Sequence, residues 1–142
     1  MSETKDICLR FMGLIDAHKV EEAAALCAPD VKFSVSGLGD ANLETWKQFV
    51  AAMLDAVPDC NHPISNVVEA GDQMFVEFRW QGTHTRPLLS PQGEIPATGK
   101  HIDIRCSSVF EVAAGRITAE RGYFDQVEFL TQLGLMPAPV AA

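Results

Sequence analysis

Gly115-Arg116-Ile117-Thr118-Ala119-Glu120-Arg121-Gly122-Tyr123-Phe124-Asp125-Gln126-Val127-Glu128 is the stretch of sequence that decides the fold. Its pattern predicts a strand that runs directly into a helix, with a carboxyl group at the junction. Because side chains alternate along a strand, we expect one face to carry Ile117, Ala119, Arg121, Tyr123 and Asp125. That face begins apolar and ends with a guanidinium, a phenol and an acid. We therefore expect a pocket with an apolar floor and a polar mouth.

The composition is that of one globular domain. The chain has 142 residues, of which 47% are hydrophobic and 21% charged. We expect a single domain over residues 1–136 and a flexible tail over residues 137–142. The formal net charge of -8 disfavours nucleic acid and anionic membrane as partners, because both require a basic face. No apolar run approaches the ~20 residues of a membrane span.

The four cysteines, Cys8, Cys27, Cys60 and Cys106, form no CxxC motif and have no metal-ligand spacing. The first six residues are polar and acidic, unlike a signal peptide. We therefore expect reduced thiols in a cytoplasmic protein.

The first half of the chain has the periodicity of helices. Apolar side chains recur every three or four residues before residue 18, and an alanine-rich helix is expected over Val20–Cys27. Val31–Ser36 alternates as a strand does, and Gly37–Asp40 is expected to be a turn. The clearest helix begins at the cap residue Asn42 and ends at Pro58.

The second half predicts long strands. They are expected over Asn61–Glu69, Gln73–Thr85 and His101–Val112, with a loop over Arg86–Ala97 where glycine and proline are frequent. A closing helix follows Asp125. The order of elements predicts an α+β fold, in which a curved antiparallel sheet wraps around helices as a cone and encloses an apolar cavity.

Several fragments of the second half resemble a known family. In chain order they are Val57-Pro58-Asp59, Glu69-Ala70-Gly71-Asp72, Gln81-Gly82-Thr83-His84-Thr85, Pro96-Ala97-Thr98-Gly99-Lys100, Gly115-Arg116-Ile117, Asp125 and Gln132-Leu133-Gly134. The ordered set, over about residues 57–135, is similar to the SnoaL-like polyketide cyclase family of the nuclear-transport-factor-2-like superfamily. That superfamily also contains isomerases, dehydratases and binding modules.

The resemblance implies a cofactor-free enzyme that closes a polyketide ring by intramolecular aldol condensation. It places the family's acid/base aspartate on Asp125 and brings His84 close to the same pocket. Tyr123 departs from the His or Trp of many relatives, and Pro96-Ala97 from their double proline. The base of ketosteroid isomerases would fall within Ser34–Ser36, which makes that design doubtful. The family also implies a homodimer.

Asp125 has a second interpretation. Asp125-Gln126-Val127-Glu128 matches a capping box, in which the aspartate accepts amide hydrogen bonds at a helix start. Capping stabilises the charged carboxylate and lowers its pKa, whereas burial in an apolar cavity raises it. Both roles stay open from the sequence.

The other candidate residues also have alternatives. His84 is either a structural histidine or a group that orients Asp125 or protonates an oxyanion. Tyr123 either donates to an enolate or is an ordinary aromatic on a sheet, and Arg121 either binds an acidic substrate or pairs with a glutamate. The expected lining of the pocket, which could equally be core, is Phe33, Phe49, Met53, Phe78, Trp80 and Cys106.

The motifs of other enzyme classes are missing from the sequence. It has no glycine-rich phosphate loop, no GxSxG and no Cys-His arrangement. His101 and Asp103 share a strand face but have no third ligand at a suitable spacing, so no metal site is expected. We therefore expect an acid/base enzyme for a small apolar or aromatic carbonyl compound, with Asp125, His84 and Tyr123 as its catalytic groups. The alternatives are a non-catalytic binding module with the same pocket and, less favoured, an interaction domain that uses the outer sheet face.

Overall fold

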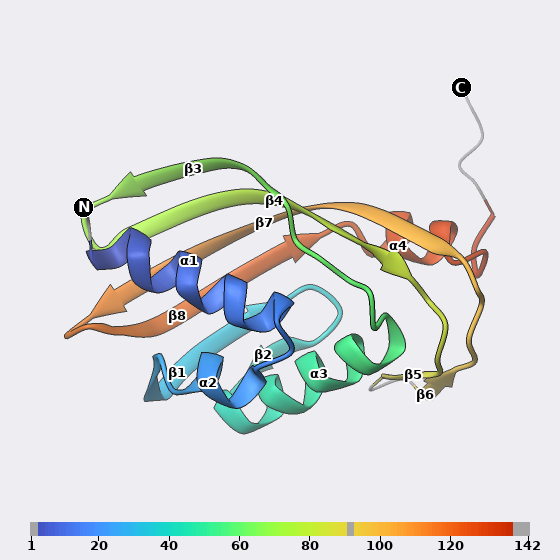
Figure 1. Ribbon diagram of the computed structural model, residues 1–142, viewed down its shortest axis with the longest axis horizontal. Helices are drawn as coiled ribbons and strands as arrows, with labels where there is room; N and C mark the ends of the chain where they lie inside the picture. The colour runs from blue at the N-terminus through green and yellow to red at the C-terminus, as the bar shows by residue number, and fades with distance from the viewer. Residues whose placement is uncertain (1–2, 91–92, 138–142) are drawn as a thin grey trace.

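The computed structural model describes residues 3–90 and 93–137, which form four helices and eight strands (Figure 1). The helices are α1 (Glu3–Asp16), α2 (Val20–Ala24), α3 (Leu43–Ala56) and α4 (Gln126–Gln132). The strands are β1 (Cys27–Val35), β2 (Gly39–Ala41), β3 (Ile64–Ala70), β4 (Gln73–Thr83), β5 (Leu88–Ser90), β6 (Gly93–Ile95), β7 (His101–Ala113) and β8 (Arg116–Phe124).

Six strands form one curled sheet in the order β2-β1-β8-β7-β4-β3. Neighbours pair antiparallel except β1 and β8, which run parallel. The expected α+β class is confirmed, and the sheet is mixed rather than wholly antiparallel. The parallel pair forms because the long connection between β1 and β8, which includes α3, lets the chain return in the same direction.

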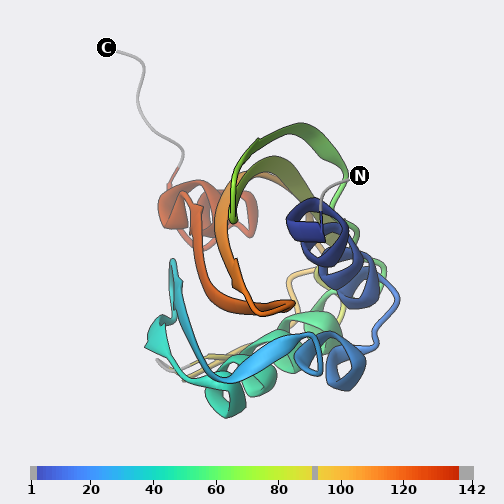
Figure 2. The ribbon, with the colours of Figure 1, turned by 90° about the vertical axis from the view of Figure 1, so that its left-hand side faces the viewer.

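The curl of the sheet creates the interior. Seen end-on, the strands follow an arc from β3 through β7 and β8 to β1, and α1 closes the open side of the arc (Figure 2). The part of β7 that extends beyond β8 is bordered by α4, where Gln132 Oε1 accepts the Asp103 N–H at 2.7 Å. Helices therefore enclose a space that the sheet alone leaves open.

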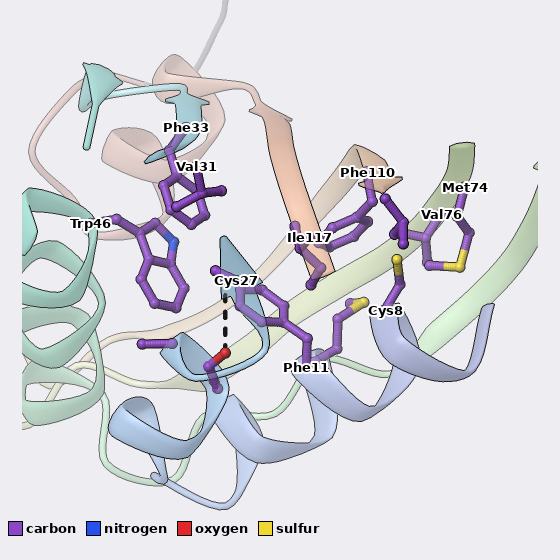
Figure 3. Close-up of a cluster of buried hydrophobic side chains, with 14 residues drawn as sticks. Cys8, Phe11, Cys27, Val31, Phe33, Trp46, Met74, Val76, Phe110 and Ile117 are labelled. Carbon is purple, nitrogen blue, oxygen red and sulfur yellow. Dashed lines mark hydrogen bonds between the residues drawn. The ribbon is translucent and has the colours of Figure 1, made fainter. Parts of the chain in front are cut away.

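The core has two parts. The first joins α1, α2 and β1 to the paired ends of β4, β7 and β8, and its centre is shown in Figure 3. There the Trp46 ring stacks on Phe33 at 4.7 Å and on Phe11 at 5.2 Å between ring centroids. Such pairs contribute about 0.5–1.5 kcal/mol each beyond their burial. The second part lies around Trp80, whose ring stacks on Phe129 of α4 at 5.1 Å.

Three expectations need correction. The second helix ends at Ala24, and Cys27 already belongs to β1. The expected turn over residues 37–40 contributes Gly39 and Asp40 to β2. The expected loop over residues 86–97 contains the β5–β6 hairpin, because Pro87 and Pro96 lie just outside its paired residues and leave their hydrogen bonds intact.

Two further expectations concern the ends and the membrane. The predicted flexible tail falls mostly on residues 138–142, which lie outside the described residues. Across residues 3–90 and 93–137, no helix has both the length and the apolar character needed to cross a membrane.

Candidate functional site

A cavity of about 140 Å³ lies between the two parts of the core. It is bounded by α1, α3, the segment before β3 and the inner face of β4, β7 and β8. Its walls are mostly apolar, and the polar side chains that reach it are few: His62, Ser108, Glu120 and Tyr123. Both tryptophans of the chain, Trp46 and Trp80, line it.

Most of the expected apolar lining residues border this cavity. Phe49, Met53, Phe78, Trp80 and Cys106 all do so. Phe33 is the exception, because its ring is stacked on Trp46 within the core. Tyr123 borders the cavity but is 53% exposed.

A bulge in β8 decides which side chains face the cavity. Val112 of β7 pairs with Ile117, but the adjacent Glu111 pairs with Ala119, so Thr118 is an extra residue in β8. An inserted residue moves every later side chain to the opposite face. The expectation that Arg121 and Asp125 point toward the pocket is therefore wrong, whereas Tyr123 still borders the cavity. The inner positions beyond the bulge are Glu120, Gly122 and Phe124.

Glu120 is the carboxyl group of the cavity. Desolvation raises its pKa from 4.5 to about 7, while a hydrogen bond from the Ser108 hydroxyl acts in the opposite direction. Gly122 lies beside this hydroxyl, since a Cβ at that position would be 3.4 Å from Ser108 Oγ. A carboxyl group with a pKa near neutrality can both accept and return a proton at pH 7.

A second polar pair lies where the segment before β3 borders the cavity. His62 lines the cavity, and its Nδ1 lies 2.5 Å from Asp16 Oδ1 at the end of α1. The backbone N–H of His62 donates to the other oxygen, Asp16 Oδ2, at 3.3 Å. Neither residue is predicted from the sequence. The only signal is that His62 lies three residues after the last residue of the family fragment Val57-Pro58-Asp59.

Asp125 caps α4. Its Oδ1 accepts the N–H groups of Val127 at 2.9 Å and Glu128 at 3.2 Å, and the residue is not among those that line the cavity. The capping interpretation of this carboxylate therefore matches its surroundings.

His84 and Arg121 also lie away from the cavity lining. His84 is 1% exposed and holds the loop before β7: its Nδ1 accepts the Thr98 N–H at 3.3 Å, and its backbone N–H donates to Lys100 O at 2.9 Å. Burial lowers the pKa of its imidazole. Arg121 Nη1 donates to Glu111 Oε2 at 2.5 Å, which is the ion pair that the sequence left as one of two roles.

The thiols of the cavity are not nucleophiles. Burial raises the pKa of Cys106 to about 12 and that of Cys60 to about 11, so both stay protonated at neutral pH. In the part of the chain that the structure describes, no three His, Cys, Asp or Glu side chains gather so as to hold a metal ion.

Solved structures share this fold. A proposed SnoaL-like polyketide cyclase from Jannaschia sp. CCS1 is 19% identical with a TM-score of 0.82, over 95% of this chain and 94% of that one. AclR, a proposed hydroxylase from Streptomyces galilaeus, is 15% identical with a TM-score of 0.84, over 96% and 99%. IdmH, a proposed polyketide cyclase from Streptomyces antibioticus, is 22% identical with a TM-score of 0.78, over 94% and 99%.

At these identities the structures establish the fold alone. No curated protein matches the sequence. The family profile described as SnoaL-like polyketide cyclase, however, matches residues 5–133, which is nearly the whole chain. This protein therefore belongs to the SnoaL-like polyketide cyclase family.

Proposed function

We propose that this protein is a cofactor-free acid/base enzyme that removes a proton next to a carbonyl group of a small polyketide-like substrate. The resulting enolate then attacks a second carbonyl of the same molecule in an aldol-type ring closure. The family supports a cyclase-like activity, and the cavity suits a small, mainly apolar ligand.

The observation that carries this proposal is the position of Glu120. Its carboxyl group lies in an apolar cavity, and burial raises its pKa to about 7. Proton transfer from carbon is fastest when the base has a pKa close to the working pH. We therefore assign the role of the base to Glu120, in place of the expected Asp125.

The cavity walls would add an entropic contribution. Ring closure requires that two parts of a flexible chain meet, and aromatic walls such as Trp46, Phe78 and Trp80 can hold the folded shape. In the cycle, Glu120 takes the proton from carbon, and the alkoxide formed with the new carbon–carbon bond takes a proton in return. The aldol addition is an isomerisation, and a later loss of water involves no net oxidation or reduction. No redox partner is therefore needed.

A neutral bicyclic ketone, 2-tetralone, can test the proton-transfer step without the natural substrate. In D₂O the enzyme should accelerate exchange of the protons next to the carbonyl, as measured by proton NMR. Glu120→Gln keeps the shape of the side chain and should lower this exchange rate by about 100-fold or more. Glu111→Gln is the matched control: it removes a carboxylate from the neighbouring strand that pairs with Arg121 instead of lining the cavity. An unchanged rate in Glu120→Gln would contradict the proposal.

The alternative function is a binding module with the same pocket. Because Trp46 and Trp80 line the cavity, their fluorescence reports ligand binding directly. Saturable quenching by 2-tetralone without any accelerated exchange would favour this alternative.

Two expectations about the protein's context stay predictions. The family resemblance suggests a homodimer, which light scattering at micromolar concentration would check, and a monomer would count against it. Residence in the cytoplasm is likewise an expectation from the sequence.

A further inference from the structure

We propose that Asp16 and His62 supply a second proton-transfer group where the segment before β3 borders the cavity. His62 would be the catalytic residue and Asp16 the residue that positions it. This inference rests on the proposed function and deepens it, because the reaction then uses two proton carriers instead of one.

The contacts of His62 leave one ring nitrogen available. Nδ1 is bonded to Asp16 Oδ1 at 2.5 Å, and no hydrogen-bond partner for Nε2 is found among the described residues. His62 borders the cavity, whereas Asp16 does not. Asp16 therefore stands behind the imidazole and fixes its orientation, while Nε2 is left for a ligand.

The backbone holds this imidazole in a rigid position. On one side of His62, Asn61 forms an isolated bridge with Gln81 through two hydrogen bonds of 3.0 and 3.1 Å. On the other side, Pro63 O accepts the N–H of Arg79 at 3.0 Å. The segment before β3 is thus attached to β4 on both sides of the histidine, as a preorganised catalytic group requires.

The hydrogen bond to Asp16 also fixes the tautomer. A carboxylate can only accept, so the Nδ1 proton stays between the two residues. Nε2 then carries a proton in the imidazolium form and a lone pair in the neutral form. The same nitrogen can therefore donate a proton in one half of a reaction and accept it in the other.

The two groups complement each other over an aldol cycle. In the first half, ionised Glu120 takes the proton from carbon while the imidazolium Nε2–H of His62 protonates the carbonyl oxygen, which gives an enol. In the second half, the enol carbon attacks the second carbonyl, His62 takes back the enol proton and Glu120 protonates the new alkoxide. One carbon–carbon bond forms, the carbonyl π bond breaks, and both side chains return to their starting states.

The other titratable groups near these two residues do not compete for this role. The Cys60 thiol, close to Asp16, has its pKa raised to about 11 by burial. Asp59 Oδ1 is engaged by the Thr83 N–H at 2.8 Å. Near Glu120, burial raises the pKa of the Cys8 and Cys27 thiols to about 12, and the Glu120 charge adds to that effect. All three thiols are therefore neutral over the pH range in which Glu120 titrates.

The test uses exchange of 2-tetralone protons in D₂O as a function of pH. The wild-type rate should rise with pH as Glu120 ionises and should depend on the presence of the His62 imidazole. His62→Gln should lower the maximal rate by about 100-fold and keep the rise that is due to Glu120, with 2-tetralone affinity by tryptophan fluorescence unchanged within about twofold. In His62→Gly, added imidazole should restore part of the rate, which it should not do in Glu120→Gln. His101→Gln, a histidine that contacts Thr83 outside the cavity, is the matched control.

Asp16→Asn tests the positioning role. It should lower the rate by about tenfold in the wild-type background and have little further effect in His62→Gln, because the two residues act as a unit. If His62→Gln retains the wild-type rate while Glu120→Gln is inactive, the inference fails and the proposed function stands. If the wild type gives no acceleration at all, the proposed function fails, and this inference fails with it.

Discussion

Two carboxyl groups five residues apart have opposite environments in this protein. Glu120 faces an apolar cavity, where desolvation dominates and raises its pKa to about 7. Asp125 lies at the start of α4, where two backbone N–H groups donate to it. Such bonds satisfy N–H groups that have no partner within the first turn of the helix. The first environment suits proton transfer, and the second stabilises a helix.

Substitutions at Asp125 should therefore affect stability and not activity. Asp125→Ala removes the cap and should lower the free energy of unfolding by about 1 kcal/mol. Asp125→Asn keeps a capping oxygen and should lie within a few tenths of a kcal/mol of the wild type. Urea unfolding measures both values. Exchange of the 2-tetralone protons should proceed at the wild-type rate in both variants. A large loss of this exchange in Asp125→Asn would instead indicate that Asp125 is catalytic.

The sequence predicted the capping box at Asp125 but not the position of Glu120 in the cavity. Alternation along a strand is a local rule, and it held for β4 and β7, where Phe78, Trp80 and Cys106 face inward as expected. In β8 the extra residue Thr118 reverses it. A bulge depends on the pairing with the neighbouring strand, so the sequence pattern of the strand itself does not indicate it.

At the scale of elements, one close contact fixes the segment that carries His62. Gly82 of β4 lies against the chain after α3: a Cβ built on Gly82 would come within 2.4 Å of Val57 Cγ1 and 3.0 Å of Cys60 Cα. Cys60 Cα is a backbone atom, which cannot move aside as a flexible side chain does. The glycine thus lets β4 and the segment over residues 57–60 pack directly on each other.

Gly82→Ala should push this segment away from β4. We expect the free energy of unfolding to fall by about 1–3 kcal/mol, as for other overpacked sites. Because the displaced segment leads into His62, exchange activity should fall as well. Gly13→Ala in α1 is the matched control: a Cβ there meets nothing within 4 Å, so the variant should be about 0.5–1 kcal/mol more stable. Wild-type stability in Gly82→Ala, measured by urea unfolding, would contradict the assigned contact.

Elements with strong local signals were predicted well. The helix α3 begins after Asn42, whose Oδ1 accepts the Thr45 N–H at 2.9 Å, as the cap predicted from sequence requires. The β5–β6 hairpin was missed, because its three-residue strands are too short to show periodicity among prolines and glycines. The parallel pairing of β1 with β8 was missed because it joins residues far apart in the chain.

At the scale of the molecule, charge should select the ligand. The chain has a formal net charge of -8, and the cavity adds a carboxylate above about pH 7. A ligand with its own carboxylate should therefore bind more weakly as Glu120 ionises. Between about pH 6 and pH 8 we expect the Kd of 2-naphthoate to rise by about tenfold, and that of neutral 2-naphthol to change by less than about twofold.

Tryptophan fluorescence measures both affinities, because Trp46 and Trp80 line the cavity. Glu120→Gln carries no charge and should make the affinity for 2-naphthoate independent of pH over this range. A pH-dependent Kd for 2-naphthoate that persists in Glu120→Gln would assign the effect to another group.

The desolvated Glu120 should also make global stability depend on pH. Its pKa is about 7 in the folded protein and 4.5 as the unperturbed value, so between these pH values the folded state binds more protons than the unfolded state. The contribution of Glu120 to the free energy of unfolding is therefore fully present below about pH 4.5, and it is lost as the pH rises through about 7. The difference in pKa corresponds to on the order of 3 kcal/mol.

Glu120→Gln cannot ionise and should not lose this contribution. Other carboxylates titrate in both proteins, so the informative quantity is the difference in the free energy of unfolding between the variant and the wild type. Measured by urea unfolding, the variant's free energy of unfolding should rise relative to that of the wild type by on the order of 3 kcal/mol between about pH 4 and pH 8. A difference that is constant with pH would mean that Glu120 is solvated in the folded protein. Since the catalytic assignment depends on the same desolvation, that result would remove the physical basis for Glu120 as the base.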